Sequence, residues 1–308
     1  FYTTGKVYFT GPYDGAPFGA SVVVPAVAGP FNLGNVVVRA AFRINPATAQ
    51  ATIVSNPFPT IIDGVPLRVK TIHVALDRPG FVFNPTNCAE QQLTATVTAE
   101  QGATAAVSSP FAATGCTALP FKPRFTASTE GKTSKQNGAS LLVKVAQKAG
   151  EADIHRVDLQ LPTAFPSRLT TLQKACTEAQ FNANPAGCPE GSFIGTAKAV
   201  TPVLNVPLAG PAILVSHGGA AFPDVEFILQ GEGVEIVLDG KTQIKKGVTY
   251  SHFETVPDAP ISSFETVLPE GPHSVLAGYV PANANGSFCG LNLAMPTTIE
   301  AQNGARIK

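Results

Sequence analysis

Apolar and polar residues alternate along much of this chain, which is the pattern of β-strands that bury one face. The clearest run spans residues 36–44, where Val38 and Phe42 share one parity and Arg39 and Arg43 share the other. We therefore expect one face of this strand to be buried and the face that carries both arginines to meet solvent.

The residues that follow predict a small antiparallel sheet. Residues 45–48 (Asn-Pro-Ala-Thr) form a turn signal, because the fixed φ of proline suits a type I turn. Residues 49–53 alternate again and are expected to return beside the first strand. In a third run, residues 67–76, the apolar residues occupy odd-numbered positions at first and even-numbered positions after Lys70 and Thr71. This change of register predicts a β-bulge.

Turn and helix signals define the other expected elements. Gln101-Gly102, Asp239-Gly240 and Asn303-Gly304 are two-residue hairpin signals. Residues 167–180 show helical spacing of apolar positions, with Ser167 as the N-cap. The remaining strands are expected at residues 124–129, 139–147, 153–161, 193–200, 212–216, 225–229, 250–256, 263–268, 274–280 and 297–301.

Composition supports an all-β fold and excludes one class of partner. The 308 residues include 28 glycines and 27 prolines, which suits short strands joined by many turns. Lysine and arginine total 21 and balance 21 acidic residues, whereas a nucleic-acid partner would need a basic patch. The longest apolar run, residues 20–31, contains Pro25, Gly29 and Pro30 and is too short to span a bilayer.

We therefore predict an all-β protein with two or three Ig-like or Greek-key β-sandwich domains. Residues 1–17 are expected to form an N-terminal strand or lead-in segment and residues 18–121 a first β-sandwich domain. Residues 122–308 are expected to form a second β-sandwich domain with one short helix near residues 167–180. The boundary is placed at residues 119–123 because two prolines bracket a crossover there.

Five cysteines indicate a disulfide framework rather than a zinc site, because their spacing contains no Cys-x-x-Cys. Cys88 and Cys116 flank an expected hairpin, and Cys176 and Cys188 flank a short loop. We predict these two local pairs, and the alternative is a set of reduced, buried thiols. Cys289 is left over as the fifth cysteine.

Candidate chemistry is limited to three histidine groups. They are His217 with Asp224 and Glu226, Asp153 with His155, and His252 with Glu254. Each group combines metal-ligand types, but a plainer role as a loop histidine, a hydrogen-bonded core-edge histidine or a solvated strand face also fits. The sequence contains no serine-nucleophile, zinc-protease or phosphate-loop motif. We therefore expect no catalytic residue, no bound metal and no cofactor.

Two further signals concern carbohydrate. Asn285-Gly-Ser matches an N-glycosylation sequon. The chain has no tryptophan, so a sugar-binding surface would rely on its tyrosines. These are Tyr2, Tyr8, Tyr13, Tyr250 and Tyr279.

Four segments of the sequence carry a family resemblance. They are VVVRAAFRINPATAQATIVSNPFPTIIDGVPLRVKTIHVALDRPGFVFNPTNC, LPFKPRFTASTEGKTSKQNGASL, LQLPTAFPSRLTTLQKACTEAQF and FETVPDAPISSFETVLPEGPHSVLA. The chain, over nearly its whole length, resembles a family of large, exported, functionally uncharacterised bacterial proteins. The resemblance implies export, a β-rich modular architecture and more sequence on both sides, and it transfers no catalytic residue.

These observations favour an extracellular or cell-surface structural protein that is a subunit of a filament or surface assembly and not an enzyme. Two alternatives stay open. A carbohydrate- or surface-binding β-sandwich module needs an exposed tyrosine-lined groove, and a secreted hydrolase needs two histidine pairs to converge. Phe1 is not a translation start, which predicts a processed or truncated chain.

The two ends of the sequence predict how such an assembly forms. The turn at Asn303-Gly304 leads into a short return strand, so we expect an incompletely paired sheet edge there. Residues 1–10 alternate and are expected to complete that edge in a neighbouring copy, head to tail, as a filament. The alternative is a monomer in which residues 1–10 pair within their own domain. The expected assembly residues are Phe1, Tyr2, Val7, Tyr8, Phe9 and Ile307.

Overall fold

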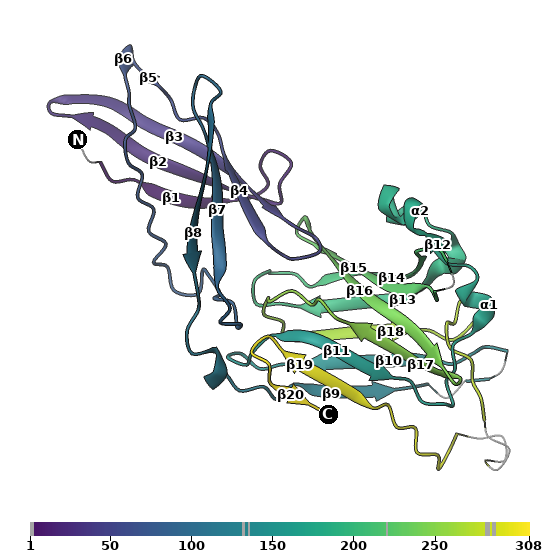
Figure 1. Cartoon of the computed structure of the whole chain (residues 1–308). Coiled ribbons are helices and arrows are strands. Elements are labelled where there is room, and N and C mark those ends of the chain that lie inside the picture. The colour runs from purple at the N-terminus through teal and green to yellow at the C-terminus, as the bar shows by residue number, and fades with distance from the viewer. Residues whose placement is uncertain (1–2, 131–132, 135, 220, 281–283, 285–287) are drawn as a thin grey trace. The chain divides into compact units, whose positions relative to one another are not determined.

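The computed structural model has a predominantly β architecture with short helices, as the sequence predicts (Figure 1). It describes residues 3–130, 133–134, 136–219, 221–280, 284 and 288–308. In this described part, no helix combines the length and the apolar content that crossing a membrane requires. The chain divides into two compact units, Phe1–Val82 with Gln230–Ile236 and Phe83–Leu229 with Val237–Lys308.

The first unit contains a four-stranded antiparallel sheet. Its strands, in spatial order, are β1 (Lys6–Thr10), β2 (Phe18–Ala28), β3 (Phe31–Ile44) and β4 (Ala51–Ser55). The alternation of β3 and the return of β4 agree with the sequence pattern, because Phe42 lies opposite Ile53 across the two strands.

One face of this sheet is apolar. Phe18 lies opposite Phe42, and Phe9 lies opposite Ala20, so these residues point to the same side. The Phe9 ring contacts those of Phe18 and Phe42 at centroid distances of 5.4 and 5.6 Å. We call this side the apolar face, and it consists of Val7, Phe9, Phe18, Ala20, Val22, Val38, Ala40, Phe42 and Ile53.

Residues 67–76 do not form the expected strand, and the expected bulge at Lys70 and Thr71 is therefore also wrong. The short strands β5 (Ile61–Ile62) and β6 (Val65–Pro66) pair with each other, and strand pairing stops at Pro66. The alternating pattern of residues 67–76 is real, but a strand also needs a neighbouring backbone for its N–H and C=O groups.

The second unit contains a twelve-stranded sheet, apart from residues 230–236 at the junction of β15 and β16, which belong to the first unit. Along the sheet the order is β20-β19-β11-β17-β16-β15-β14-β13-β18-β10-β9, and β12 pairs with β14. The strands span β9 (Arg124–Ser128), β10 (Leu141–Ala146), β11 (Ile154–Gln160), β12 (Cys176–Thr177), β13 (Phe193–Val200), β14 (Leu208–Ser216), β15 (Asp224–Gly231), β16 (Val234–Lys245), β17 (Val248–Phe253), β18 (Ser263–Leu268), β19 (Thr297–Ala301) and β20 (Arg306–Ile307).

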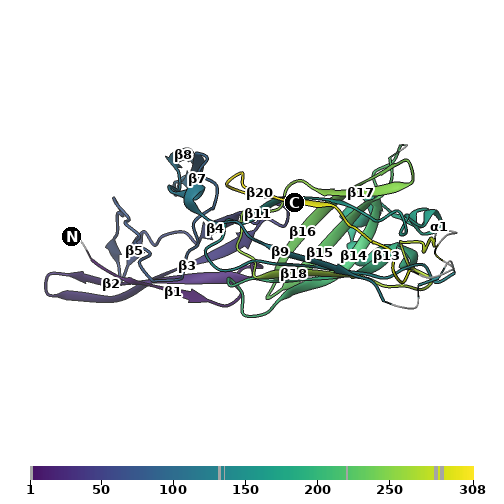
Figure 2. The same cartoon turned by 90° about the horizontal axis from the view of Figure 1, so that it is seen from below.

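This sheet curls so that its two ends share one core. Val145 of β10 packs with Ile154 of β11 and Ile299 of β19, although β10 and β19 lie near opposite ends of the strand order. Phe125 of β9 and Ile307 of β20 pack against the same cluster. Figure 2 shows β9 and β18 in one layer and β17 and β20 in the layer that faces it.

The expected helix at residues 167–180 is interrupted. The structure has α1 (Leu169–Leu172), then β12, then α2 (Glu178–Ala183). Cys176 breaks the helix because it pairs with Val215 of β14 and forms a disulfide with Cys188. A new helix then begins at Thr177, whose side chain caps it by accepting a hydrogen bond from the backbone N–H of Gln180.

Two other sequence expectations in this unit are wrong. Asp239-Gly240 is not a hairpin turn but part of the continuous strand β16, where a larger residue than Gly240 would overlap the ring of Phe253. Residues 274–280 form no strand, and Leu276 makes only isolated bridges to Ala139 and Ser167.

A long two-stranded hairpin, β7 (Gln91–Thr98) and β8 (Thr104–Phe111), also belongs to the second unit. The expected turn at Gln101-Gly102 is confirmed. The division into units thus differs from the expected boundary near residue 121. The reason is that hydrogen bonds from Thr86 and Asn87 to Asp258 attach the start of this segment to the second unit.

Of the two alternatives for the N-terminal residues, a strand or a lead-in segment, the structure has the strand, β1. In the first unit, β1 pairs along its whole length with β2, from Lys6 opposite Val23 to Thr10 opposite Gly19. The segment expected to be donated to a neighbouring copy is therefore paired in its own chain, as the monomer alternative requires. Of the expected assembly residues, Phe1 and Tyr2 lie outside the described residues, and Ile307 pairs with Ile299.

The structure contains both predicted disulfides, Cys88–Cys116 and Cys176–Cys188, whereas Cys289 is exposed and belongs to neither. We expect replacement of either pair by serine to lower the free energy of unfolding by roughly 2–4 kcal/mol, because each bond restricts the unfolded chain. Urea unfolding of the two double variants measures the loss, and peptide mapping without reductant checks the pairing. A Cys88–Cys188 link would contradict the assignment.

Candidate functional site

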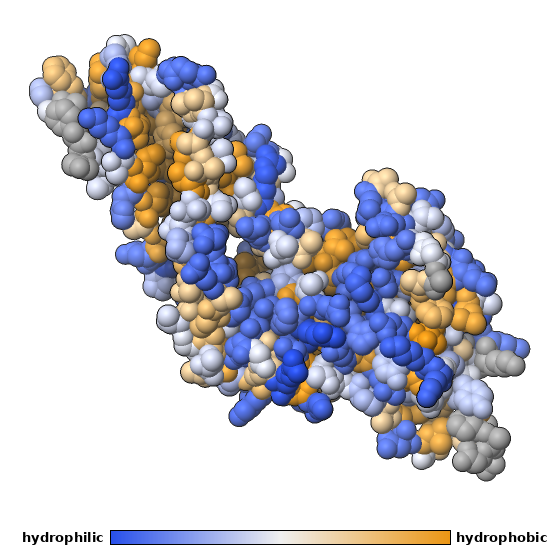
Figure 3. Space-filling view, viewed as in Figure 1, coloured by the Kyte–Doolittle hydropathy of each residue, from blue (hydrophilic) through white to orange (hydrophobic). Residues whose placement is uncertain are grey.

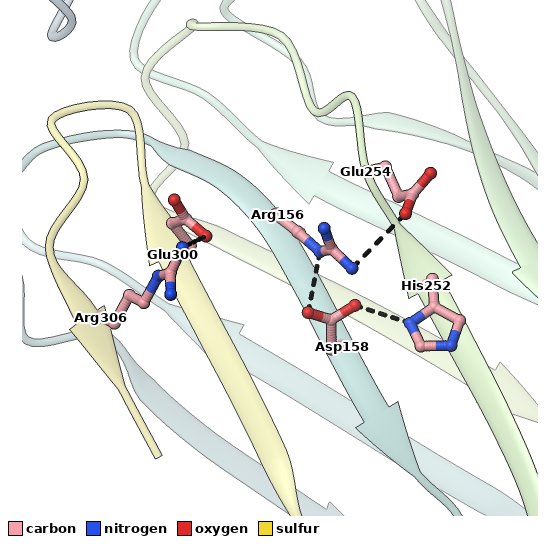
Figure 4. A network of polar contacts seen from close by, with 6 residues as sticks. All are labelled: Arg156, Asp158, His252, Glu254, Glu300 and Arg306. Carbon is pink, nitrogen blue, oxygen red and sulfur yellow. Dashed lines mark hydrogen bonds and ion pairs between the residues drawn. The ribbon is translucent and has the colours of Figure 1, made fainter.

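A network of charged residues crosses one face of β11, β17, β19 and β20 in the second unit (Figure 4). The strand register builds it, because Asp158 lies opposite His252 on one side, and Arg156 lies opposite Glu300 on the other. We call it the charged face, and its members are Arg156, Asp158, His252, Glu254, Glu300 and Arg306.

Asp158 is the centre of the charged face. Its Oδ1 lies 2.7 Å from Nδ1 of His252, and its Oδ2 accepts a hydrogen bond of 2.8 Å from Nε of Arg156. Arg156 also lies 3.4 Å from Glu254. Burial tends to raise the pKa of Asp158, but the hydrogen bonds to His252 and Arg156 outweigh burial and lower it. Asp158 is therefore a carboxylate at neutral pH.

The Asp158–His252 pair is the arrangement that orients a histidine for proton transfer or ligand binding. The ring of Tyr250 stacks on that of His252 at a centroid distance of 6.5 Å. The six residues of the charged face include no serine, threonine or cysteine that could act as a nucleophile. Beside His252, these six residues therefore offer no hydroxyl or thiol nucleophile.

A second group of charged residues lies at β14, β15 and β16. His217 is 3.5 Å from Asp224, and Lys241 bridges Asp224 at 3.7 Å and Asp239 at 2.9 Å. The group also includes Glu178, whose Oε1 is 3.4 Å from Nδ1 of His217. We call it the Asp224 cluster, and it consists of Glu178, His217, Asp224, Glu226, Asp239 and Lys241.

Glu226 is the member of the Asp224 cluster whose pKa is shifted most. Its exposed fraction is 5%, and burial, with added repulsion from Asp239 and Asp224, raises its pKa to about 8. Its Oε2 is buried and, among the described residues, accepts no hydrogen bond. A hydrogen bond to Asp239 raises the pKa of Lys241, so the ammonium group stays charged and supplies the positive charge of the cluster.

A third feature is a pair of carboxyl groups, the buried Asp153 and the half-buried Asp258. Asp258 accepts hydrogen bonds from the backbone and side chains of Thr86 and Asn87, at 2.7–3.1 Å. Burial, then the charge of Asp258 and a hydrogen bond to it, raise the pKa of Asp153 to about 7. Asp153 therefore keeps its proton to a much higher pH than an ordinary carboxyl group does.

The structure brings some sequence candidates together and separates others. His217 and Asp224 come within 3.5 Å, and His252 and Glu254 join the charged face through Asp158 and Arg156. Asp153 instead interacts with Asp258, whereas His155 provides a backbone carbonyl for Val256. Across the described ranges of the chain, no group of three or more histidine, cysteine or acidic residues has metal-binding geometry.

The tyrosines expected for sugar binding belong to different units. Tyr8 and Tyr13 lie in the first unit, whereas Tyr250 and Tyr279 lie in the second. Arg39 covers the ring of Tyr13 at 3.6 Å, so that ring face is occupied. Tyr2 and the sequon residue Asn285 lie outside the described residues.

The sequence did not single out Arg156, Asp158 or Asp258, which organise these sites. Their partners lie far away along the chain, as with Asp158 and His252. Comparison of the chain with protein-family models, with curated proteins and with solved structures gives no match.

Proposed function

We propose that this chain is a disulfide-braced structural module of an extracellular or cell-surface protein and that it self-associates through the first unit. The observation that carries the proposal is the exposure of apolar side chains on that unit. On the apolar face, Val7 is 45%, Phe9 51% and Ile53 59% exposed. Figure 3 shows hydrophobic residues gathered over this unit.

The first unit also has a small hydrophobic core. Among its described residues, Val38 and Val234 are the large apolar side chains that are buried, and the other buried apolar residues are Ala16, Ala20, Ala40 and Ala41. Exposed apolar area costs about 25 cal/mol per Å², and large contiguous patches on soluble proteins mark interaction sites. A partner surface over the apolar face would remove this cost.

The charged groups support a structural role rather than an enzymatic one. In the charged face, carboxylates of Asp158 and Glu254 are matched by Arg156, and Glu300 is matched by Arg306 at 3.0 Å. On this strand surface the carboxylates and the arginines therefore neutralise one another within the same chain. The two disulfides support an oxidising location outside the cell.

Sedimentation velocity tests the proposal. We expect species larger than the 31.9 kDa monomer to grow between micromolar and millimolar concentration. The double variant Val7→Thr with Ile53→Thr keeps strand-forming residues but removes apolar area, so it should weaken association about tenfold or more. Electron microscopy of the purified protein shows whether the assemblies are filaments, sheets or closed oligomers.

A matched control is Val37→Thr, because Val37 lies on the opposite face of the same sheet and is 55% exposed. It should leave association almost unchanged. A monomer at every concentration, or an equal effect of Val37→Thr, would contradict the proposal.

A further inference from the structure

We propose that the second unit accepts an extended strand between β9 and β20, and that residues 67–76 of a second copy provide it. The proposal rests on the self-association proposed above and adds a second contact to that of the apolar face. The acceptor is a groove with a volume of about 450 Å³ between the two ends of the curled sheet.

The groove is lined mainly by apolar residues, with Thr297 and Lys308 as its polar members. Phe125 of β9 lines one side, Ile299 of β19 and Ile307 of β20 line the other, and Met295 also contributes. Phe125 and Ile307 are half-buried and pack on the core beneath. The groove therefore suits uncharged, branched side chains that enter from outside and extend this core.

The backbone N–H and C=O groups of the strands beside the groove determine what kind of peptide can bind there. In the described sheet, β9 pairs only with β10, and β20 pairs only with β19. Each strand thus has an outer edge whose N–H and C=O groups have no strand beside them. An extended peptide with its own backbone donors and acceptors satisfies such an edge, as in β-strand addition.

Residues 67–76 have the properties of such a peptide. Ile72, Val74 and Leu76 alternate, and each is 55–58% exposed. Alternate residues of a strand point to the same side about 7 Å apart, so these three can enter the groove together. This segment has the sequence of a strand but lies outside every sheet of the described structure. By contrast, β1 already pairs with β2 and would have to leave it to be donated.

A photo-crosslinking peptide tests the acceptor. The probe is a synthetic peptide of residues 66–77 with a diazirine analogue of leucine at position 76, mixed with the whole chain. We expect saturable crosslinks to residues 123–125 and 295–307, located by mass spectrometry. The same peptide with Val74→Pro lacks one backbone N–H and should crosslink much less. Crosslinks scattered over the chain, or equal crosslinking by the proline peptide, would overturn the acceptor assignment.

Variants of the whole chain test the donor. Ile72→Asp with Val74→Asp should weaken self-association at least tenfold without unfolding, because both side chains are exposed. The matched control is Val203→Asp, whose side chain has the same 55% exposure as that of Ile72 but lies outside the donor segment. Normal association of the double variant would overturn this donor while leaving the proposed function intact. A chain that stays monomeric would overturn both.

Discussion

Raising the pH from 5 to 8 is expected to destabilise the second unit by several kcal/mol. Asp153 and Glu226 cause the loss, because burial raises their pKa values to about 7 and about 8. In the unfolded chain both carboxyls release their protons near pH 4. Between that pH and the folded pKa the native state holds more protons, so stability falls as the pH rises.

The size of the effect follows from the difference between the folded and unfolded pKa values. For Asp153, which is 5% exposed, it amounts to roughly 2–4 kcal/mol, present below pH 4 and lost by about pH 8. Urea unfolding at a series of pH values measures it.

Two substitutions to amides test whether Asp153 and Glu226 cause this loss of stability. Asp153→Asn retains a donor for Asp258 but does not titrate, so it should be more stable than the parent at pH 8 and similar at pH 5. Glu226→Gln should remove the remaining loss at higher pH. A double variant whose stability varies with pH as steeply as that of the parent would refute the assignment.

Truncating Ile213 is expected to lower the free energy of unfolding by roughly 2–5 kcal/mol, as Ile213→Ala. Ile213 of β14 is fully buried and packs with Cys176, Val215 and Ile228 beneath α2. The substitution leaves a cavity that the Cys176–Cys188 disulfide keeps from collapsing. Urea or thermal unfolding measures the loss.

Ile61→Ala is the matched control, since Ile61 is 63% exposed in β5. Its effect should stay below about 0.5 kcal/mol. If the two alanine variants lose equal stability, the cluster around Ile213 is not a core.

Local sequence signals predicted those elements whose partners are nearby in the chain. The Asn303-Gly304 turn joins β19 and β20, and the alternation of residues 36–44 marks β3, because each depends on a few neighbouring residues. Asp239-Gly240 has the same turn chemistry but lies within β16. There the glycine makes space for Phe253, a residue of another strand that the local pattern does not reveal.

The same limit applies to the candidate sites. The sequence identified His252 and Glu254 because they share a strand face, and both belong to the charged face. It did not identify Asp158, since the pairing of β11 with β17 joins residues far apart in the chain. Burial of Asp153 and Glu226 likewise depends on the whole curled sheet, so their raised pKa values had no local signal.

The curled sheet also determines when the second unit can fold. Its shared core joins Val145 and Ile154 to Ile299 and Ala301, so the sheet cannot close until the last of these residues has been synthesised. A topology with such high contact order folds slowly, whereas β1 to β4 and β7 to β8 pair as local hairpins. During synthesis the early hairpins therefore form before the sheet closes, and partly folded chains with such unpaired strand edges are prone to aggregate.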